Sequence, residues 1–331
     1  MTIQEAKKFA AQKIAAVSAS PELDADVLLQ ALLGRDKTFV LLNRTFELAP
    51  EQEARFLEWT AARAKGLPVA YITGKKEFYG LAFFVSQSVL IPKPDTEILV
   101  ARAVEILSER IDSGASGTVS TPKTAGGENH SQAKEGGGGP LLSVCDMCAG
   151  SGCVAISVMR TLIDGERVPL DLIPTFVLAD ISAAALEVAQ KNARALLSSQ
   201  ELERVKFVQS NLFDNVPFKF DMILSNPPYI PHGQARGLLA DGRSEPLLAL
   251  DGDVSANGDF SGTDDGLEVF RRLALEARVR LAPGGDFLCE TGEYNADAAA
   301  AFLRANGYKN VGIELDLEGQ KRVVCAKAAS L

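Results

Sequence analysis

The second half of the chain predicts an α/β protein with a doubly wound, mainly parallel sheet of seven strands. Seven short apolar runs after residue 140 have the length and composition of strands, and helix-like patterns separate most of them. A glycine-containing turn follows the first run directly. Consecutive parallel strands need a crossover connection, which a helix usually supplies. The alternation of strand and helix therefore favours this layered architecture.

Each element of the sheet follows from its local pattern. Strands buried on both faces are short and almost continuously apolar, which predicts Leu141–Asp146, Thr175–Ala179, Val205–Gln209, Asp221–Ser225, Asp286–Glu290, Gly312–Asp316 and Arg322–Ala326. Apolar residues three or four positions apart predict helices at Gly152–Leu162, Ala183–Leu197, Gly266–Leu281 and Ala296–Ala305.

Residues 1–67 predict a small helical domain. The first helix should have one apolar face, made by Phe9, Ile14 and Val17. A second helix begins at Pro21, where the missing N–H is harmless, and ends at Gly34. A third amphipathic stretch covers residues 50–65. Since no reactive side chains cluster here, the domain is either a plain structural bundle or a module that recognises a substrate or partner.

Residues 68–95 are expected to form a β-hairpin connector. Two β-rich runs, Val69–Ile72 and Leu81–Val85, are separated by Gly74 and Gly80. The remaining residues, 96–331, form the α/β domain. It should open with a helix that ends near Arg110 and is capped by Asp95 or Thr96.

Two segments of the α/β domain have the composition of insertions. Residues 112–140 are rich in Gly, Ser, Thr and Lys, which predicts a flexible loop. Residues 251–265 carry aspartates at the spacing of a calcium loop. Ala256 and Gly262 stand where such a loop needs its turn glycine and its bidentate glutamate, so calcium is not expected.

Composition bounds the function. The net charge of −9 disfavours a protein whose main task is to bind duplex DNA, because phosphate neutralisation supplies most of that affinity. Five cysteines indicate a reducing compartment, and Cys145-x-x-Cys148 lacks a second pair at zinc spacing, so we expect no metal. Neither a signal peptide nor an apolar run of about 18 residues is present, which favours a cytoplasmic protein away from membranes. We expect a monomer.

The segment Cys148-Ala149-Gly150-Ser151-Gly152 predicts a cofactor loop. It follows the first strand and opens a helix, where glycines let the backbone approach a ligand. Asp180 ends the next strand, where a carboxylate can accept hydrogen bonds from both ribose hydroxyls. We expect Asn211 and Leu212 after the third strand, with Asp146 in the first, to complete a ring around a nucleoside. Gly150-x-Gly152-x-x-Ala155 also fits a dinucleotide fingerprint.

The segment Asn226-Pro227-Pro228-Tyr229 distinguishes a methyl donor that contains a nucleoside from the dinucleotide cofactor of a dehydrogenase. It follows the apolar run Met222–Leu224, and its prolines remove competing N–H donors. The Asn226 side-chain oxygen and the Pro227 carbonyl can accept both hydrogens of a planar NH2 group, and Tyr229 offers a flat face for it. A dehydrogenase has no need of this pocket, whereas methyl transfer to an amide or aromatic amine does. His232 is expected on an exposed loop rather than as a base.

These residues match a known family: the chain resembles the HemK/PrmC methyltransferases. The resemblance covers nearly the whole chain outside the two insertions and rests on Pro68–Gly74, Val89–Glu97, Ala179–Leu186, Ser225–Ile230, Glu245–Leu250 and Asp264–Leu267. It implies the class I fold of S-adenosylmethionine-dependent methyltransferases. It further implies S-adenosylmethionine on Cys148–Gly152, Asp180 and Leu212, with a glutamine amide held by Asn226–Tyr229. The helical domain would dock a peptide chain release factor and present its Gly-Gly-Gln loop.

The chain departs from the family pattern in three places. Lys93 stands where the family usually has Arg, Cys148-Ala149-Gly150 replaces Gly-Thr-Gly, and Asn295 lies where a Gln is common. A related activity on the same scaffold methylates a glutamine of a ribosomal protein, and this substrate remains an alternative. So does an adenine-N6 or guanine-N2 nucleic-acid methyltransferase, although such an enzyme needs a basic channel that this acidic chain does not indicate. A non-catalytic translation-factor adaptor is the remaining alternative.

Overall fold

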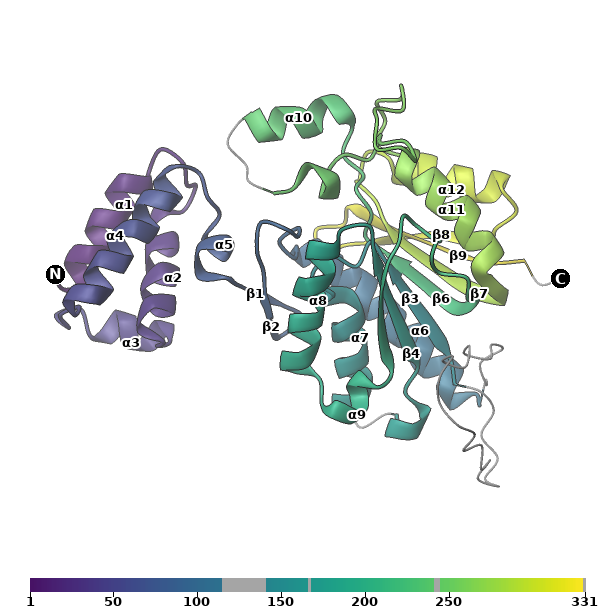
Figure 1. Cartoon of the computed structure of the whole chain (residues 1–331), viewed down its shortest axis with the longest axis horizontal. Helices are drawn as coiled ribbons and strands as arrows, with labels where there is room; N and C mark the ends of the chain where they lie inside the picture. The colour runs from purple at the N-terminus through teal and green to yellow at the C-terminus, as the bar shows by residue number, and fades with distance from the viewer. Residues whose placement is uncertain (115–140, 166–167, 241–244, 330–331) are drawn as a thin grey trace.

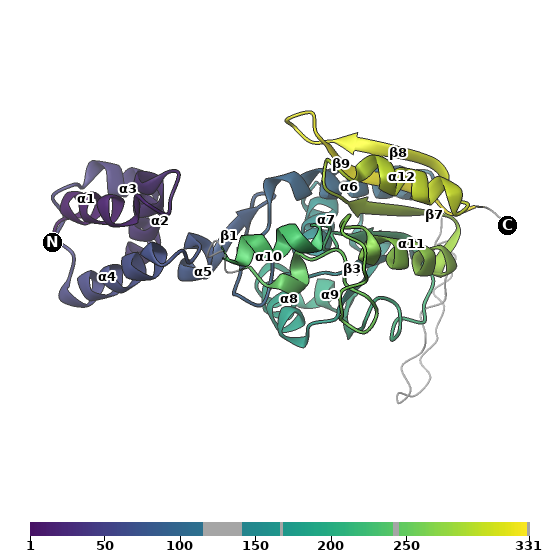
Figure 2. The same ribbon diagram turned by 90° about the horizontal axis from the view of Figure 1, so that it is seen from above.

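The computed structural model describes residues 1–114, 141–165, 168–240 and 245–329 (Figure 1). Four helices pack together at one end of the molecule: α1 (Ile3–Ile14), α2 (Pro21–Leu33), α3 (Lys37–Leu42) and α4 (Pro50–Ala64). Both views place this helical head apart from the sheet (Figure 2). The predicted insertion 112–140 lies outside the described residues apart from its first three positions, the end of α6 and the two residues after it.

The predicted apolar face of the first helix is wrong. Phe9 and Val17 are 41% and 40% exposed, whereas Ile14 is buried. The buried stripe of α1 is instead Ile3, Ala6, Ala10 and Ile14. Small alanines let α1 approach α2 and α4 closely, so the helix needs no large side chain in the middle of its contact. The sequence did not predict the short helix α3. Its N-cap is Asp36, whose carboxylate accepts from the Phe39 N–H at 2.8 Å.

The first predicted strand of the connector is also wrong, because Val69–Thr73 forms the helix α5. Pro68 precedes it, and Gly74 ends it with a left-handed φ of 70°, so these two residues outweigh the β preference of the run. The hairpin consists of β1 (Lys75–Phe78) and β2 (Leu81–Phe84). Its two-residue turn, Tyr79-Gly80, has positive φ at both positions, as a hairpin turn that matches the strand twist requires.

The seven-stranded, mainly parallel sheet is confirmed, with the order β5-β4-β3-β6-β7-β9-β8. Its strands are β3 (Ser143–Met147), β4 (Thr175–Asp180), β5 (Val205–Gln209), β6 (Phe220–Ser225), β7 (Leu281–Glu290), β8 (Lys309–Leu315) and β9 (Lys321–Lys327). The first five are parallel, and β9 pairs antiparallel with both β7 and β8. The sheet starts in the middle, at β3, and runs outward through β4 to β5. On the other side β6 and β7 follow, and the last strand, β9, inserts between β7 and the edge strand β8.

Helices cover both faces of the sheet (Figures 1 and 2). Successive β3 residues point to opposite faces, so Val144 joins one apolar core and Cys145 joins the other. The first core packs against α6 (Glu97–Asp112), α7 (Cys153–Asp164) and α8 (Ala183–Leu196), and the second against α11 (Glu268–Arg280) and α12 (Ala296–Ala305). The short helices α9 (Ser199–Leu202) and α10 (His232–Ala240) were not predicted. Within the described ranges, no helix is long and apolar enough to cross a membrane.

Candidate active site

A cavity of about 300 Å³ lies at the carboxyl ends of the parallel strands. Four polar or reactive side chains reach it from strand ends: Cys148 from β3, Asp180 from β4, Asn211 from β5 and Asn226 from β6. The strand order reverses between β3 and β6, and doubly wound proteins bind ligands at such a switch point. The topology therefore concentrates the predicted site residues in one place.

The cavity separates the predicted site residues into two groups. Seven of them line it: Cys148, Gly150, Asp180, Asn211, Leu212, Asn226 and Pro228. Five do not, namely Ala149, Ser151, Gly152, Pro227 and Tyr229. Asp146, expected in a ring around the nucleoside, is buried beneath the loop instead, where its carboxylate accepts from the Ala155 N–H at 3.1 Å. That expectation was wrong, because the Asp146 side chain is 1% exposed, does not line the cavity and is bonded to the first turn of α7.

The loop after β3 owes its shape to three residues in the left-handed region. Cys148, Gly150 and Gly152 have φ values of 62°, 54° and 76°. A Cβ on Gly152 would come within 3.1–3.2 Å of Ile156, Leu178 and Ala189, so this glycine allows helix α7 to pack against the sheet and α8. Cys148 adopts the same backbone conformation with a side chain, which is unfavourable for an L-residue. Burial raises the pKa of its thiol to about 12, so the sulfur stays protonated at neutral pH.

Asp180 holds this loop from the neighbouring strand. Its Oδ2 accepts from the Gly150 N–H at 2.8 Å, and its Oδ1 accepts from the Ser182 N–H at 2.9 Å. Each carboxylate oxygen has a second lone pair, so both can still accept from a ligand hydroxyl. Burial raises the pKa of Asp180, while these backbone N–H donors act in the opposite direction. The carboxylate is thus oriented at the cavity wall before any ligand arrives.

Asn211 connects the cavity to residues 251–265. Its Nδ2 donates to the Ala256 carbonyl oxygen, and its Oδ1 accepts from Arg272, both at 3.2 Å. Because both ends of the amide are used, Asn211 positions the loop that forms a wall of the cavity. That wall includes Asp251, Val254, Ser255, Ala256 and Gly258. The sequence identified this segment only as an insertion and missed its place in the site.

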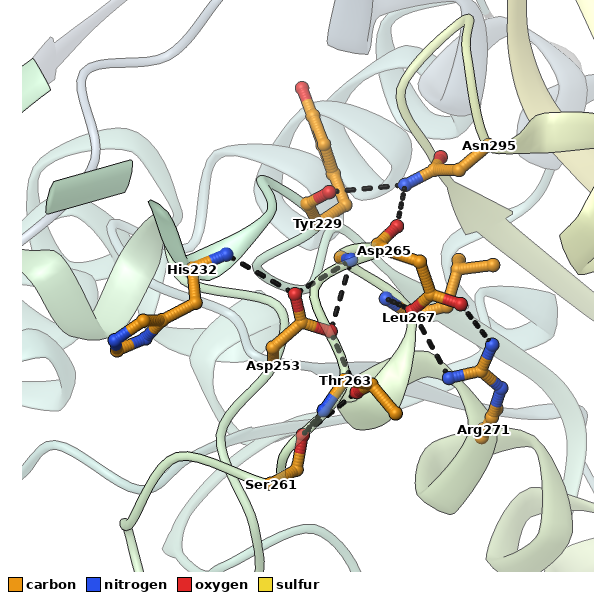
Figure 3. A network of polar contacts seen from close by, with 10 residues as sticks. Tyr229, His232, Asp253, Ser261, Thr263, Asp265, Leu267, Arg271 and Asn295 are labelled. Atoms are coloured by element: carbon orange, nitrogen blue, oxygen red, sulfur yellow. Dashed lines mark hydrogen bonds and ion pairs between the residues drawn. The ribbon is translucent and has the colours of Figure 1, made fainter. Parts of the chain in front are cut away.

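Asp253 organises the same segment from a fully buried position (Figure 3). Its carboxylate accepts from the Gly266 N–H, the His232 N–H and the Thr263 hydroxyl at 2.9–3.2 Å. His232 was expected on an exposed loop, and that expectation is wrong. It begins α10, its Nδ1 lies 2.6 Å from Asp251 Oδ2, and its ring stacks on Phe260 with centroids 4.4 Å apart.

Asn226 is oriented by Thr96, which lies at the start of α6. Its Nδ2 donates to Thr96 Oγ1 at 3.1 Å across 130 positions of sequence. Asp95 or Thr96 was expected to cap α6; Thr96 occupies the N-cap position, but its side chain makes no capping bond. Within the described residues, neither Asn226 Oδ1 nor the Pro227 carbonyl oxygen has a hydrogen-bond donor. Asn226 Oδ1, from a residue that lines the cavity, and the Pro227 carbonyl oxygen, from the residue next to it, are therefore both free to accept.

Tyr229 is fixed by both its side chain and its backbone. Its Oη donates to Glu290 Oε1 at 3.1 Å, and its carbonyl oxygen accepts from Tyr294 Oη and Asn295 Nδ2 at 3.2 and 3.1 Å. Burial and the adjacent Glu290 raise the pKa of Tyr229, so the phenol stays protonated. Asn295, one of the departures from the family pattern, thus serves the site from outside the cavity, with its amide also reaching the Asp265 carbonyl oxygen (Figure 3).

Gly266 provides a test of how closely the 251–265 segment and Tyr229 are coupled. A Cβ there would lie 2.0 Å from the Tyr229 carbonyl oxygen, whereas one on Gly262 would meet nothing within 4 Å. Both glycines have positive φ, 72° and 91°, so alanine strains the backbone at both. We expect Gly266→Ala to lower the free energy of unfolding by about 2 kcal/mol more than the control Gly262→Ala does. This difference corresponds to a Tm that is roughly 5 °C lower. Equal melting temperatures by calorimetry would contradict this coupling.

Comparison with known proteins places this site in a class. The profile of the PrmC N-terminal domain matches residues 5–74, and that of the methyltransferase small domain matches residues 140–241. A release factor glutamine methyltransferase from Moorella thermoacetica is 34% identical over 98% of this chain and 98% of its own length. One from Clostridium acetobutylicum is 30% identical over 93% of this chain and 92% of its own. A solved methyltransferase structure from Pyrococcus furiosus, 14% identical, has a TM-score of 0.43 over 85% of this chain and 100% of that one.

The sheet order, the cavity at its switch point and the sequence matches define an enzyme with the class I methyltransferase fold. The first matched segment covers the helical head and α5, which a bare methyltransferase domain would not need. The chain belongs to the release factor glutamine methyltransferase family.

Proposed function

We propose that this chain transfers a methyl group from S-adenosylmethionine to the side-chain amide nitrogen of the glutamine in the Gly-Gly-Gln motif of peptide chain release factors. The proposal rests mainly on two hydrogen-bond acceptors without a donor in the described part of the structure, Asn226 Oδ1 and the Pro227 carbonyl oxygen. They lie beside a cavity in which the Asp180 carboxylate is already held in place by the Gly150 N–H. The names of the sequence relatives support the substrate.

The residues of the cavity fit the cofactor. Asp180 presents acceptors for two ribose hydroxyls, and Gly150 lets the backbone approach without a side chain. Apolar side chains, among them Val89, Leu90 and Leu212, line the same cavity and suit a flat base. When bound, S-adenosylmethionine supplies an electrophilic methyl group. Asn211 acts through the 251–265 segment, which it holds against the cavity.

The chain's own residues prepare the amide nitrogen. An amide lone pair is delocalised into the carbonyl and is a poor nucleophile. Accepting both amide hydrogens, on Asn226 Oδ1 and the Pro227 oxygen, raises electron density at nitrogen and fixes its orientation. Most of the rate gain then comes from positioning. The proton leaves nitrogen after methylation, when it has become acidic, so the step needs no dedicated base.

We propose the same division of the chain that the sequence predicts. The head, residues 1–67, recognises the release factor, residues 68–95 connect it, and residues 96–331 carry the methyltransferase site. Exposed apolar side chains on the head support a docking role, since Leu42 is 78% exposed and its neighbour Leu41 40%. All five cysteines are free thiols, which supports a cytoplasmic location. The monomeric state stays a prediction.

The substrate is tested by methyl transfer from labelled S-adenosylmethionine to purified release factor, ribosomal proteins and DNA in parallel. We expect label on the release factor and none when its Gly-Gly-Gln glutamine is replaced by alanine. Label on a ribosomal protein alone, or on DNA alone, would keep the enzyme class and overturn the substrate. Transfer to none of them would favour the adaptor alternative.

A further inference from the structure

The half-buried side chain of Arg272, on α11, lines the cavity beside the segment that follows β5. Its Nη2 donates to Asn211 Oδ1 at 3.2 Å. Among the described residues, Arg272 forms no ion pair and no second hydrogen bond. A guanidinium group has five N–H donors and stays charged at neutral pH. Most of the donors of Arg272 are therefore left for a ligand that enters the cavity.

The packing of α11 fixes Arg272 at this place. One turn further along the same face of the helix, Glu276 Oε2 accepts from the Phe213 N–H at 3.2 Å. Leu273, next to Arg272, is fully buried and belongs to the same apolar core as Phe213. The guanidinium thus projects from a helix that is bonded to the segment after β5 at two points.

The order of the strands indicates which part of the cofactor would lie here. In the proposed reaction the methyl group faces Asn226 after β6, and the ribose binds Asp180 at the end of β4. These strands flank β3 on opposite sides, and β5 lies beyond β4. The sulfur atom joins the methyl group to the ribose, and the base is attached at the far side of the ribose. The base therefore extends past Asp180 toward β5, where Asn211 and Arg272 lie.

We propose that Arg272 is a further cofactor-binding residue, whose guanidinium donates to ring nitrogens of the adenine base. This inference rests on the proposed function, because it requires S-adenosylmethionine as the cofactor. The ring nitrogens of adenine are acceptors, and arginine has only donors. Both ends of the Asn211 amide are already used, by Arg272 and by the Ala256 carbonyl oxygen. Arg272 thus supplies side-chain donors that Asn211 does not have to spare.

The methionine carboxylate is the other part of the cofactor that a guanidinium can bind. It is attached through the sulfur atom and so lies on the side of the ribose away from the base. The loop after β3 opens α7 there, and the N-terminus of a helix favours a negative group. The carboxylate is therefore expected near β3, and the base near Arg272.

Arg272→Met and Arg271→Met form a matched pair of variants. Methionine suits a helix and keeps an apolar stem, but it has neither charge nor donors. Arg271 is the next residue, does not line the cavity and binds the exposed Asp265 (Figure 3). By calorimetric titration, Arg272→Met should raise the Kd of S-adenosylhomocysteine about 10- to 100-fold. Arg271→Met should change it less than about twofold. Equal Kd values for the two variants would overturn the inference.

Methylthioadenosine tests which part of the cofactor Arg272 binds, because it keeps the base, the ribose and the sulfur but has no carboxylate. Arg272→Met should raise its Kd by the same factor as that of S-adenosylhomocysteine, within about threefold, since both ligands carry the base. If only the Kd of S-adenosylhomocysteine rises, Arg272 binds the carboxylate and the inference is wrong.

Asn211→Ala separates a direct contact from an effect that passes through Asn211. Two residues that act only through one another are not additive, whereas independent contacts are. We expect the double variant to bind S-adenosylhomocysteine at least about fivefold more weakly than Asn211→Ala alone. If Arg272→Met adds nothing to Asn211→Ala, Arg272 merely holds Asn211 in place and makes no contact with the base.

A second substitution covers the case in which Arg272→Met does not fold, which a Tm more than about 10 °C below the wild type would reveal. Arg272→Lys keeps the charge but lacks the planar arrangement of donors. It should raise the Kd of S-adenosylhomocysteine at least about threefold, and a wild-type Kd would contradict the inference.

These binding experiments use no release factor, so the two possible failures are distinguishable. A wild-type protein that binds S-adenosylhomocysteine but labels no release factor fails the proposed function alone. One that labels release factor, while Arg272→Met binds both ligands as tightly as the wild type, fails the role of Arg272 alone.

Discussion

Replacing Asn226 with alanine is expected to lower methyl transfer by about 10³-fold, because one of the two acceptors for the substrate amide disappears. The loss should be confined to kcat. Asp180 and the loop after β3 are untouched, so the Kd of S-adenosylmethionine should stay within about threefold. Single-turnover transfer of labelled methyl to release factor, beside calorimetric titration of the cofactor, separates the two quantities.

Asn215→Ala is the matched control for this experiment. Asn215 is an exposed amide in the same α/β domain whose Nδ2 donates to the Gln209 carbonyl oxygen at the surface. It should keep its activity. If Asn226→Ala retained more than about a tenth of wild-type turnover, the pocket would not act through its acceptors, and the mechanism proposed above would be wrong.

Replacing Asp180 with alanine is expected to weaken S-adenosylmethionine binding by about 100-fold, since hydrogen bonds to a charged group contribute roughly 1.5–3 kcal/mol. Two effects combine here. The ribose hydroxyls lose their acceptor, and the Gly150 and Ser182 N–H groups lose the carboxylate that fixes the cofactor loop.

Asp180→Asn gives the graded comparison. Its one oxygen can keep a single backbone bond, so its Kd should fall between those of the wild type and the alanine variant. At saturating cofactor, the kcat of both variants should be close to that of the wild type, because the amide pocket is intact. Unchanged cofactor affinity in Asp180→Ala would refute the ribose role.

Much of the site could be predicted from the sequence because parallel strands bring their carboxyl ends to one edge. Cys148, Asp180 and Asn226 each follow or end a recognisable apolar run, so their meeting at the cavity needs only the strand order. The same reasoning failed for Asp146, whose buried carboxylate accepts from the Ala155 N–H at the start of α7 and does not line the cavity.

The residues that sequence reasoning missed are those whose role depends on distant partners. Thr96 was interpreted as a helix cap because a local pattern could not show its contact with Asn226. Glu290 was interpreted only as the end of a strand. The turn glycine Gly266 touches Tyr229 across the fold, which no spacing rule reveals. Only Glu290 gave a signal in the sequence, because an acidic residue at the end of an apolar central strand is unusual enough to suggest a role in the site.

Errors in the elements had local causes. The β-branched run Val69–Ile72 became a helix because Pro68 and Gly74 supply its start and end signals. In α1 the sequence suggested that large apolar residues face the core, whereas alanines do so because the neighbouring helix is close. In both places tertiary packing and capping outweighed side-chain preference.

In the proposed mechanism, Asn226 and Pro227 hold the substrate amide through its NH2 group. A crystal structure with S-adenosylhomocysteine and a Gly-Gly-Gln peptide of a release factor tests it most directly. We predict the glutamine amide nitrogen about 3 Å from both Asn226 Oδ1 and the Pro227 carbonyl oxygen, with Asn226 Nδ2 still on Thr96. A peptide bound with its amide oxygen toward Asn226, or outside the Asn226–Tyr229 pocket, would contradict the account.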